Sequence, residues 1–478
     1  MKIRLLIIIS LLLSGINFSF AQANSSHQLF EKYDKYREKS INHRRFKHKD
    51  IVPLVLKMKE LRGVKVEEIG HSVENRSIYM VKMGTGKIPV LLWSQMHGDE
   101  PTATQALFDI FNFFSVSDEL DPLREKILSE LTLYFIPMLN PDGAERFTRR
   151  NALQIDLNRD ARRLACPESR LLKAMRERTQ AKFGFNLHDQ QTYYTAGHQK
   201  TPATITFLAP AFNPAEDMNA VRGDAAKLIV QLRDMLQKYI PNGVAKWNDD
   251  FEPRAFGELM TKWGTSTVLV ESGGYKNDPE RQFARKLNFV ILLTAFEAIA
   301  DKTYENQPVG DYFKIPLNEK MLNDLMIRHL KMKEKGRTYI EDFSFRQREI
   351  QYAHATKYYH KGYIVDKGDL VTYFGYTELD AEGMTMIPGK VLPKKYKNLT
   401  HFLKKKKALE VLKEGYTAIR LRKNDPTKVP IDFPLLVLGK KDTFRNSFRL
   451  GQNPSFLLKT ANGSAYAVVN GRLIHLKN

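Results

Sequence analysis

Two stretches of the sequence place imidazole and carboxylate side chains directly after apolar runs. His97 and Glu100 follow the run at residues 88–96, and His188 ends a shorter run that begins at residue 183. Two histidines and one glutamate are the three protein ligands typical of catalytic zinc, with water in the fourth position. A histidine with a glutamate three residues later is also common by chance, so the pair alone does not predict a site.

The elements around these residues predict how they are positioned. Apolar runs occur at residues 88–96, 131–139, 183–188 and 266–272, and helical periodicity occurs between or after them at 102–114, 168–183, 221–239 and 280–304. Apolar runs that alternate with amphipathic helices indicate an α/β domain. We expect a central, mostly parallel mixed sheet flanked by helices.

Polar groups follow the apolar runs at the points where strands should end. They are His97 with Glu100, the NPDG turn at 140–143, His188 and Glu271. Ligands of open α/β sheets bind beyond the carboxyl ends of the strands. Gly98 permits a tight turn, and Pro101 suits the first turn of the next helix. The sequence therefore predicts one site at this edge of the sheet.

These motifs give the chain a resemblance to the zinc carboxypeptidase family, the carboxypeptidase A-like metallocarboxypeptidases. The resemblance covers roughly residues 45–304 and rests on HGDE (97–100), NPDG (140–143), RRNALQIDLNRD (149–160), NLHD (186–189) and VLVESGG (268–274). The motifs occur in the family's order, and jointly they are highly specific. The resemblance implies an α/β fold with a central mixed sheet, one zinc ion per chain and a peptide substrate.

The resemblance also implies the roles of the residues around the metal. His97, Glu100 and His188 match the zinc ligands. Glu271 matches the general base that takes a proton from the zinc-bound water and later gives it to the leaving amine. Asp156 matches a carboxylate that accepts a hydrogen bond from the first ligand histidine, an arrangement that fixes the tautomer of the ring.

Three further residues match groups that bind the substrate. Asn158 and Arg159 match the pair that holds the terminal carboxylate, and a planar guanidinium can bind both carboxylate oxygens. Arg149 matches the arginine that polarises the scissile carbonyl and stabilises the developing oxyanion. Arg150 is the alternative in a shifted alignment.

The sequence departs from the family at a mobile tyrosine that usually lies between the third ligand and the general base. The stretch about twenty residues before Glu271, residues 243–266, contains no tyrosine, and the candidates for this space are Trp247, Phe251, Arg254, Tyr193, Tyr194 and Tyr275. Spacing from Glu271 places Phe256 at the floor of the specificity pocket. Arg254 and Glu258 are close enough to leave this alignment open, so the sequence predicts no preferred terminal residue.

The N-terminal residues 1–23 have the composition of a secretory signal peptide. Lys2 and Arg4 precede an apolar core, and small residues follow it. Polar residues interrupt the core before the roughly 20 apolar residues that a membrane span requires, so we expect no transmembrane anchor after cleavage. We therefore expect a secreted or periplasmic protein. Its one cysteine, Cys166, has no partner for an intramolecular disulfide.

The rest of the chain is predicted to form two domains. Residues 24–305 form the zinc carboxypeptidase-like catalytic domain, and residues 306–478 form a smaller α+β or mainly β accessory domain of unknown role. We expect the latter to begin with a helical, basic piece and to contain a hairpin at Asn470-Gly471. The lysines at 404–407 are predicted to lie on a solvated helix face.

Composition limits the classes of function. A hydrophobic content of 42% and a charged content of 27% are typical of a folded globular protein. The net charge of +21 favours anionic surroundings. We expect no nucleic-acid partner, because no recognition motif is present.

We therefore expect an exported zinc metallocarboxypeptidase that hydrolyses the C-terminal peptide bond of peptides. Two alternatives are a cell-wall muropeptide carboxypeptidase and an N-acyl amino acid deacylase of the aspartoacylase or succinylglutamate desuccinylase type. A non-catalytic binding protein is disfavoured, because no ligand or base is missing. The sequence leaves the oligomeric state open.

Overall fold

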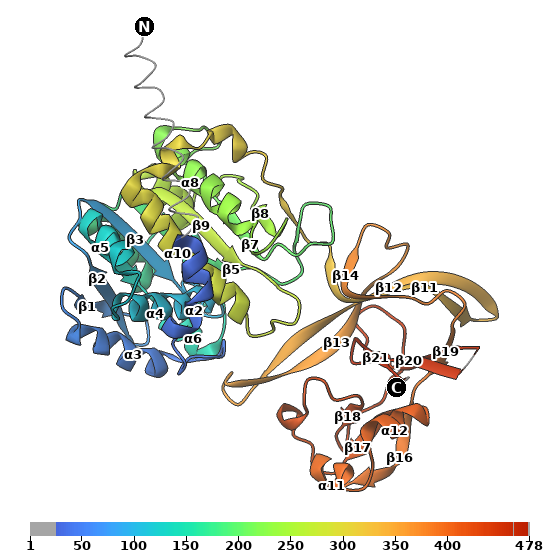
Figure 1. Ribbon diagram of the computed structural model, residues 1–478. Coiled ribbons are helices and arrows are strands. Elements are labelled where there is room, and N and C mark those ends of the chain that lie inside the picture. Colours follow the sequence, from blue (N-terminus) through green and yellow to red (C-terminus); the bar gives the residue numbers. More distant parts are fainter. Residues whose placement is uncertain (1–24, 462, 477–478) are drawn as a thin grey trace. The chain divides into compact units, whose positions relative to one another are not determined.

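The first part of the chain is built on an eight-stranded mixed sheet (Figure 1). The computed structural model describes residues 25–461 and 463–476. The strand order is β1-β2-β4-β3-β5-β9-β7-β8, and β4, β3, β5 and β9 are parallel neighbours. The strands are β1 (Lys65–His71), β2 (Ser77–Met83), β3 (Ile88–Ser94), β4 (Leu131–Ile136), β5 (Phe183–Asp189), β7 (Ile205–Leu208), β8 (Val244–Lys246) and β9 (Ser266–Ser272). The predicted α/β class is confirmed.

Helices cover both faces of this sheet, because its central strands bury both of their faces. On β3, Val90 and Leu92 point into one apolar core and Leu91 and Trp93 into the other. Helices α4, α5, α8 and α10 contribute to the first core, and α7 and α9 to the second. The helices include α2 (Tyr33–Tyr36), α3 (His48–Lys57), α4 (Thr102–Phe114), α5 (Asp121–Glu130), α6 (Pro141–Arg146), α7 (Pro167–Thr179), α8 (Ala220–Leu236), α9 (Phe256–Lys262) and α10 (Gln282–Asp301).

Two compact units divide the described chain between Lys320 and Met321, with residues 198–200 grouped with the second unit. The boundary predicted at 305/306 lies earlier, because Tyr312 and Ile315 pack into the core of the first unit. The predicted signal peptide at residues 1–23 lies outside the described residues. Within the described ranges, no helix has both the length and the apolar character of a membrane span.

A buried ion pair ties the N-terminal segment to the core of the first unit. The Asp109 carboxylate on α4 accepts hydrogen bonds from Arg285 Nε on α10 at 2.7 Å and from Tyr33 Oη at 2.9 Å. Both charged side chains have no solvent-exposed surface. Arg285 also donates to the Ile41 carbonyl at 2.9 Å. The Asp109 carboxylate therefore links α4 to Tyr33 and to α10, and Arg285 extends this link to Ile41.

Replacement of Asp109 by alanine is expected to lower the free energy of unfolding of the first unit by about 3–5 kcal/mol, because it leaves the Arg285 charge buried without its partner. The measurement is urea denaturation followed by tryptophan fluorescence. All three tryptophans, Trp93, Trp247 and Trp263, belong to this unit. The control is Glu177→Gln, which breaks an exposed pair with Lys173 and should leave the midpoint nearly unchanged. Equal denaturation midpoints for the two variants would contradict a stabilising role of the buried Asp109–Arg285 pair.

The second unit is rich in β-structure. Its larger sheet has the order β13-β12-β11-β15-β19-β20-β21, with β14 paired to β11, and its smaller parallel sheet has the order β16-β17-β18. The elements are β11 (Leu322–Glu334), β12 (Arg337–Tyr352), β13 (Lys357–Gly368), β14 (Phe374–Asp380), β15 (Thr385–Pro388), β16 (Lys390–Tyr396), α11 (Leu399–Leu403), α12 (Ala408–Lys413), β17 (Tyr416–Leu421), β18 (Leu436–Leu438), β19 (Phe456–Thr460), β20 (Gly463–Val469) and β21 (Arg472–His475).

Two local predictions for this unit are wrong and one is confirmed. The expected helical piece is the long hairpin of β11 and β12, in which pairing between strands overrides the helix propensity of its Leu, Met and Lys residues. The lysines at 404–407 are exposed but lie between α11 and α12 rather than on a helix. The Asn470-Gly471 turn joins β20 to β21, and both residues have the positive φ that a tight hairpin requires.

Candidate active site

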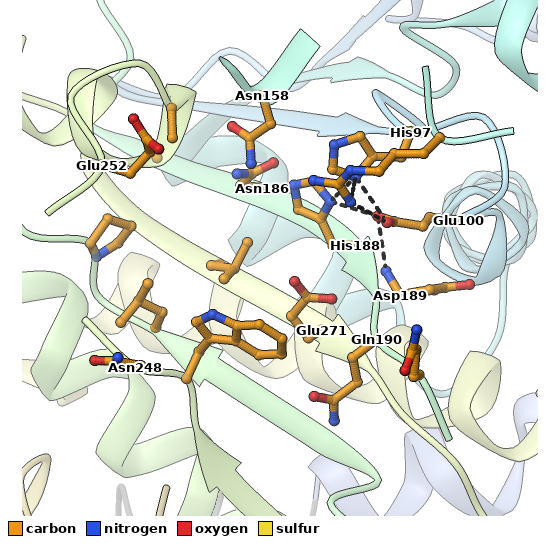
Figure 2. A pocket seen from close by; sticks show the side chains of 18 of the residues that line it. His97, Glu100, Asn158, Asn186, His188, Asp189, Gln190, Asn248, Glu252 and Glu271 are labelled. Carbon is orange, nitrogen blue, oxygen red and sulfur yellow. Dashed lines mark hydrogen bonds and ion pairs between the residues drawn. The ribbon is translucent and has the colours of Figure 1, made fainter. Parts of the chain in front are cut away.

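The central strands of the first unit bring His188 and Glu271 to the same face of the sheet. The two residues are register partners on the parallel strands β5 and β9. Phe185 and Leu187 of β5 point into the core on the opposite face, so strand alternation turns Asn186 and His188 towards the cavity. Figure 2 shows the Glu271 carboxylate directed towards the side of the cavity that holds His188 and Glu100.

The loop after β3 carries His97 and Glu100 and packs against the NPDG turn. A Cβ atom on Gly98 would lie 2.0 Å from the Gly143 carbonyl carbon, so only glycine permits this close approach. Asn140 donates from Nδ2 to the Met96 carbonyl at 3.1 Å and accepts the Gly143 N–H at 2.9 Å. The NPDG motif therefore positions the ligand loop.

His97, Glu100 and His188 form a buried cluster of candidate metal ligands. His97 Nδ1 lies 2.8 Å from Glu100 Oε1, and His188 Nδ1 lies 2.6 Å from Glu100 Oε2. The two Nδ1 atoms are 3.1 Å apart. His97 Nε2 lies 3.0 Å from Asp156 Oδ1. If Nε2 carries the ring proton and donates it to Asp156, the Nδ1 lone pair faces the cluster.

The charges of the cluster shift the pKa values of its members. Burial opposes ionisation of Glu100, but the neighbouring His97 and His188 hold its pKa below its usual range. Burial opposes protonation of His97, yet Glu100 and the hydrogen bond with Asp156 raise its pKa to about 9 when no cation is bound. Burial, followed by the charge of Glu100, raises the pKa of Glu271. Glu100 is thus held ionised at the buried position where a cation would be stabilised.

Arg149 lies beside this cluster and Arg150 does not. Arg149 donates from Nε to Asp156 Oδ2 at 2.9 Å, and its Nη1 is 3.1 Å from His97 Nδ1. Arg150 donates to the Gln154 carbonyl at 2.9 Å and is exposed. Of the two arginines, only Arg149 is placed so that its guanidinium can contact a group bound near the cluster.

The predicted carboxylate-binding pair lies along the same cavity. Asn158 uses its Oδ1 to accept the Phe256 N–H at 2.9 Å, and Figure 2 shows its amide group directed into the cavity. Arg159 Nε lies 3.3 Å from Glu252 Oε2. A carboxylate of the protein itself is therefore already paired with Arg159, a contact that the sequence did not reveal.

A cavity of about 600 Å³ joins these groups. Of the six candidates for the space of the family's tyrosine, Trp247 and Tyr194 line this cavity, with ring centroids 5.4 Å apart. Phe256, where spacing from Glu271 falls, is fully buried and is not among the residues that line it. Its chain neighbour Glu258 does line it, because the first turn of α9 directs the two side chains to different sides. Burial raises the pKa of Glu258 to about 7.

Comparisons with known proteins find similarity to carboxypeptidases. The zinc carboxypeptidase family model matches residues 56–187. Carboxypeptidase SOL1 of Arabidopsis thaliana is 34% identical over 98 residues, covering 19% of this chain and 20% of that protein. Residues 56–187 are thus similar to the zinc carboxypeptidase family. Carboxypeptidase 2 of Trichophyton tonsurans is 28% identical over 144 residues, covering 30% of this chain and 26% of that protein.

The similarity of this chain to known proteins is partial. The chain spans about a fifth to a quarter of the length of those two curated relatives. The crystal structure of carboxypeptidase A from Helicoverpa armigera is 15% identical, with a TM-score of 0.43, and the match covers 59% of this chain and 80% of that chain. The family match also ends at Leu187. The placement of His188 and Glu271 beside the matched residues therefore comes from the structure.

The donor set of the site fits the metal of the matched family, which is described as zinc carboxypeptidase. Two imidazole nitrogens and a carboxylate converge in the buried cluster, and this combination suits zinc. The contact of Asp156 with His97 supplies the outer carboxylate that commonly orients a ligand histidine. His97, Glu100 and His188 would hold the ion.

Proposed function

We propose that this protein is an exported zinc metallocarboxypeptidase that removes the C-terminal residue of peptides, with one zinc ion per chain. The observation that carries the proposal is that the three candidate metal ligands line one cavity. Glu271, Arg149 and Arg159 line the same cavity. Each group that hydrolysis at a chain end requires is present there: a metal site, a base, an oxyanion stabiliser and a carboxylate anchor.

When bound, the zinc ion would supply Lewis acidity to the hydrolytic water and the scissile carbonyl. Glu271 takes a proton from the attacking water and returns it to the leaving amine. Burial raises the pKa of Glu271, and a raised pKa favours a carboxyl that can gain as well as release a proton. Arg149 stabilises the negative charge that develops on the carbonyl oxygen.

Arg159 and Asn158 hold the terminal carboxylate of the substrate. The side chain of Arg159 is 39% exposed, so an incoming carboxylate can reach it. The substrate must share or displace the contact of Arg159 with Glu252, whose carboxylate also pairs with Arg254. Glu252 thus holds the guanidinium at the cavity before substrate binds.

Replacement of Arg159 by alanine is expected to lower kcat/KM for a free peptide by about 2–5 kcal/mol of transition-state stabilisation, because a charged partner of the substrate carboxylate is lost. The measurement compares a peptide with its C-terminal amide. The wild type should strongly prefer the acid, and the variant should lose most of this preference. Arg150→Ala is the matched control and should retain it. Equal rates of the wild type on acid and amide would refute the role of Arg159.

The reaction is tested with purified protein of measured metal content. Peptides varied at the last residue, muropeptides and N-acyl amino acids are incubated with it, and the products are identified by mass. Release of single C-terminal residues supports the proposal, whereas cleavage of N-acyl amino acids alone would replace it with deacylation. Export is tested separately by the N-terminal sequence of the mature protein, because a cleaved signal peptide leaves a new terminus near residue 24.

A further inference from the structure

The positive charge of the protein is concentrated in its second unit. Residues 321–478 contain 30 Lys and Arg and 15 Asp and Glu, so this third of the chain contributes +15 of the net charge of +21. The excess is steepest at residues 390–423, which hold 12 basic and two acidic side chains. Such a concentration attracts polyanions over roughly 10 Å at ordinary ionic strength.

The fold gathers this charge around β16, β17 and α11, which lie together in the second unit (Figure 1). The Lys423 N–H donates to the Lys397 carbonyl at 2.9 Å beyond the ends of β16 and β17. The ring centroids of Tyr396 and Phe402 lie 5.0 Å apart, and this contact holds α11 against β16. We call the exposed cations of this region the lysine surface: Lys394, Lys395, Lys397, Lys404, Lys405, Lys406, Lys407, Arg422 and Lys423.

Few carboxylates neutralise the lysine surface. Lys407 pairs with Glu410 at 3.3 Å and Lys406 with Glu414 at 3.9 Å, and these pairs are exposed. Exposed ion pairs of this kind contribute little to stability and break readily. The other members of the surface have no ion pair among the residues that the structure describes. Most of its charge is therefore available to a partner.

Exposed apolar side chains flank the lysine run. Leu403, immediately before it, is 51% exposed, and Leu409, two residues after Lys407, is 38% exposed. The aromatic rings of Tyr396 and Phe402 are buried and unavailable for base stacking. Lysines beside exposed aliphatic side chains match a lipid surface, whose phosphates attract the ammonium groups and whose acyl boundary accepts apolar groups.

We propose that the lysine surface binds the anionic headgroups of a lipid bilayer, with Leu403 and Leu409 entering its interface. This binding is independent of the proposed hydrolysis. The test is cosedimentation of the full chain with vesicles of phosphatidylcholine alone or of phosphatidylcholine with phosphatidylglycerol. Binding is expected only to the anionic vesicles and should weaken as salt is added.

Replacement of Lys404, Lys405, Lys406 and Lys407 by glutamine should weaken binding to the anionic vesicles by about 100-fold, because each lysine near such a surface contributes to the free energy of binding. Their replacement by arginine should retain binding. A matched control removes four exposed cations from the β11–β12 hairpin of the same unit, Lys331, Lys333, Lys335 and Arg337, and should change binding less than about threefold.

Circular dichroism checks that each variant is folded. Equal losses in the two glutamine variants would show a general charge effect and would overturn the proposal. Binding of the wild type to single-stranded DNA but not to anionic vesicles would also overturn it, and would identify a nucleic-acid surface instead.

Discussion

Replacement of Glu271 by glutamine is expected to lower kcat by about 10² to 10⁴, the usual contribution of general acid–base catalysis. Glutamine keeps the size of the side chain and most of its hydrogen bonds but cannot accept and return a proton. Glu271 is the register partner of His188 on the neighbouring strand, so its carboxyl lies beside the candidate ligands without being one of them. Zinc content should therefore remain near that of the wild type.

Turnover and metal content must be measured together in this variant. Loss of zinc from Glu271→Gln would make Glu271 a ligand or a support of the metal site, and undiminished turnover would remove it from the mechanism. Glu177→Gln on the exposed face of α7 is the matched control for the change of charge. It should preserve both zinc and kcat.

Replacement of His188 by alanine is expected to reduce zinc from about one ion per chain to a small fraction and to abolish hydrolysis, because two ligands remain where three are needed. Chelation of the wild type should have the same effect on activity. Metal content is measured by mass spectrometry after dialysis. Because the pKa of His97 is about 9 without a cation, zinc must displace a proton, so affinity should fall as the pH is lowered.

A second group of possible ligands provides the control for this experiment. His329, Asp380 and Glu382 lie close enough to hold a metal, but all three are exposed. His329→Ala should leave zinc content and activity unchanged, because water competes well for a cation at an exposed site. Loss of the single zinc ion from His329→Ala, with retention in His188→Ala, would relocate the metal to the second unit.

Local patterns in the sequence were enough to predict the main elements of the first unit. The periodicity at residues 102–114 and the apolar run at 266–272 coincide with α4 and β9. These signals are local, because a helix places side chains on one face every 3.6 residues and a buried strand is continuously apolar. The order of the polar groups at the strand ends then made the ligand set recognisable as a family pattern.

The identity of the residues that meet in the cavity required the tertiary structure. Arg149 and Arg150 are adjacent, and only the fold of the loop shows that Arg149 reaches His97 while Arg150 turns to solvent. The contact between Arg159 and Glu252 joins segments distant in the sequence, so no local pattern contains it. The choice between Phe256 and Glu258 stayed open for the same reason, since a fixed spacing from Glu271 cannot tell which side of α9 faces the cavity.

Composition determined the charge of the second unit, and tertiary structure decided its architecture. The sequence from residue 322 to 352 is rich in Lys, Leu, Met and Glu, which favour helices locally, but the chain pairs it as β11 and β12. A register shift near His329, a residue with positive φ, also breaks the alternation that would have marked β11 as a strand. Hydrogen bonds between strands and burial of one face outweigh local propensity, and both depend on partners that the segment does not contain.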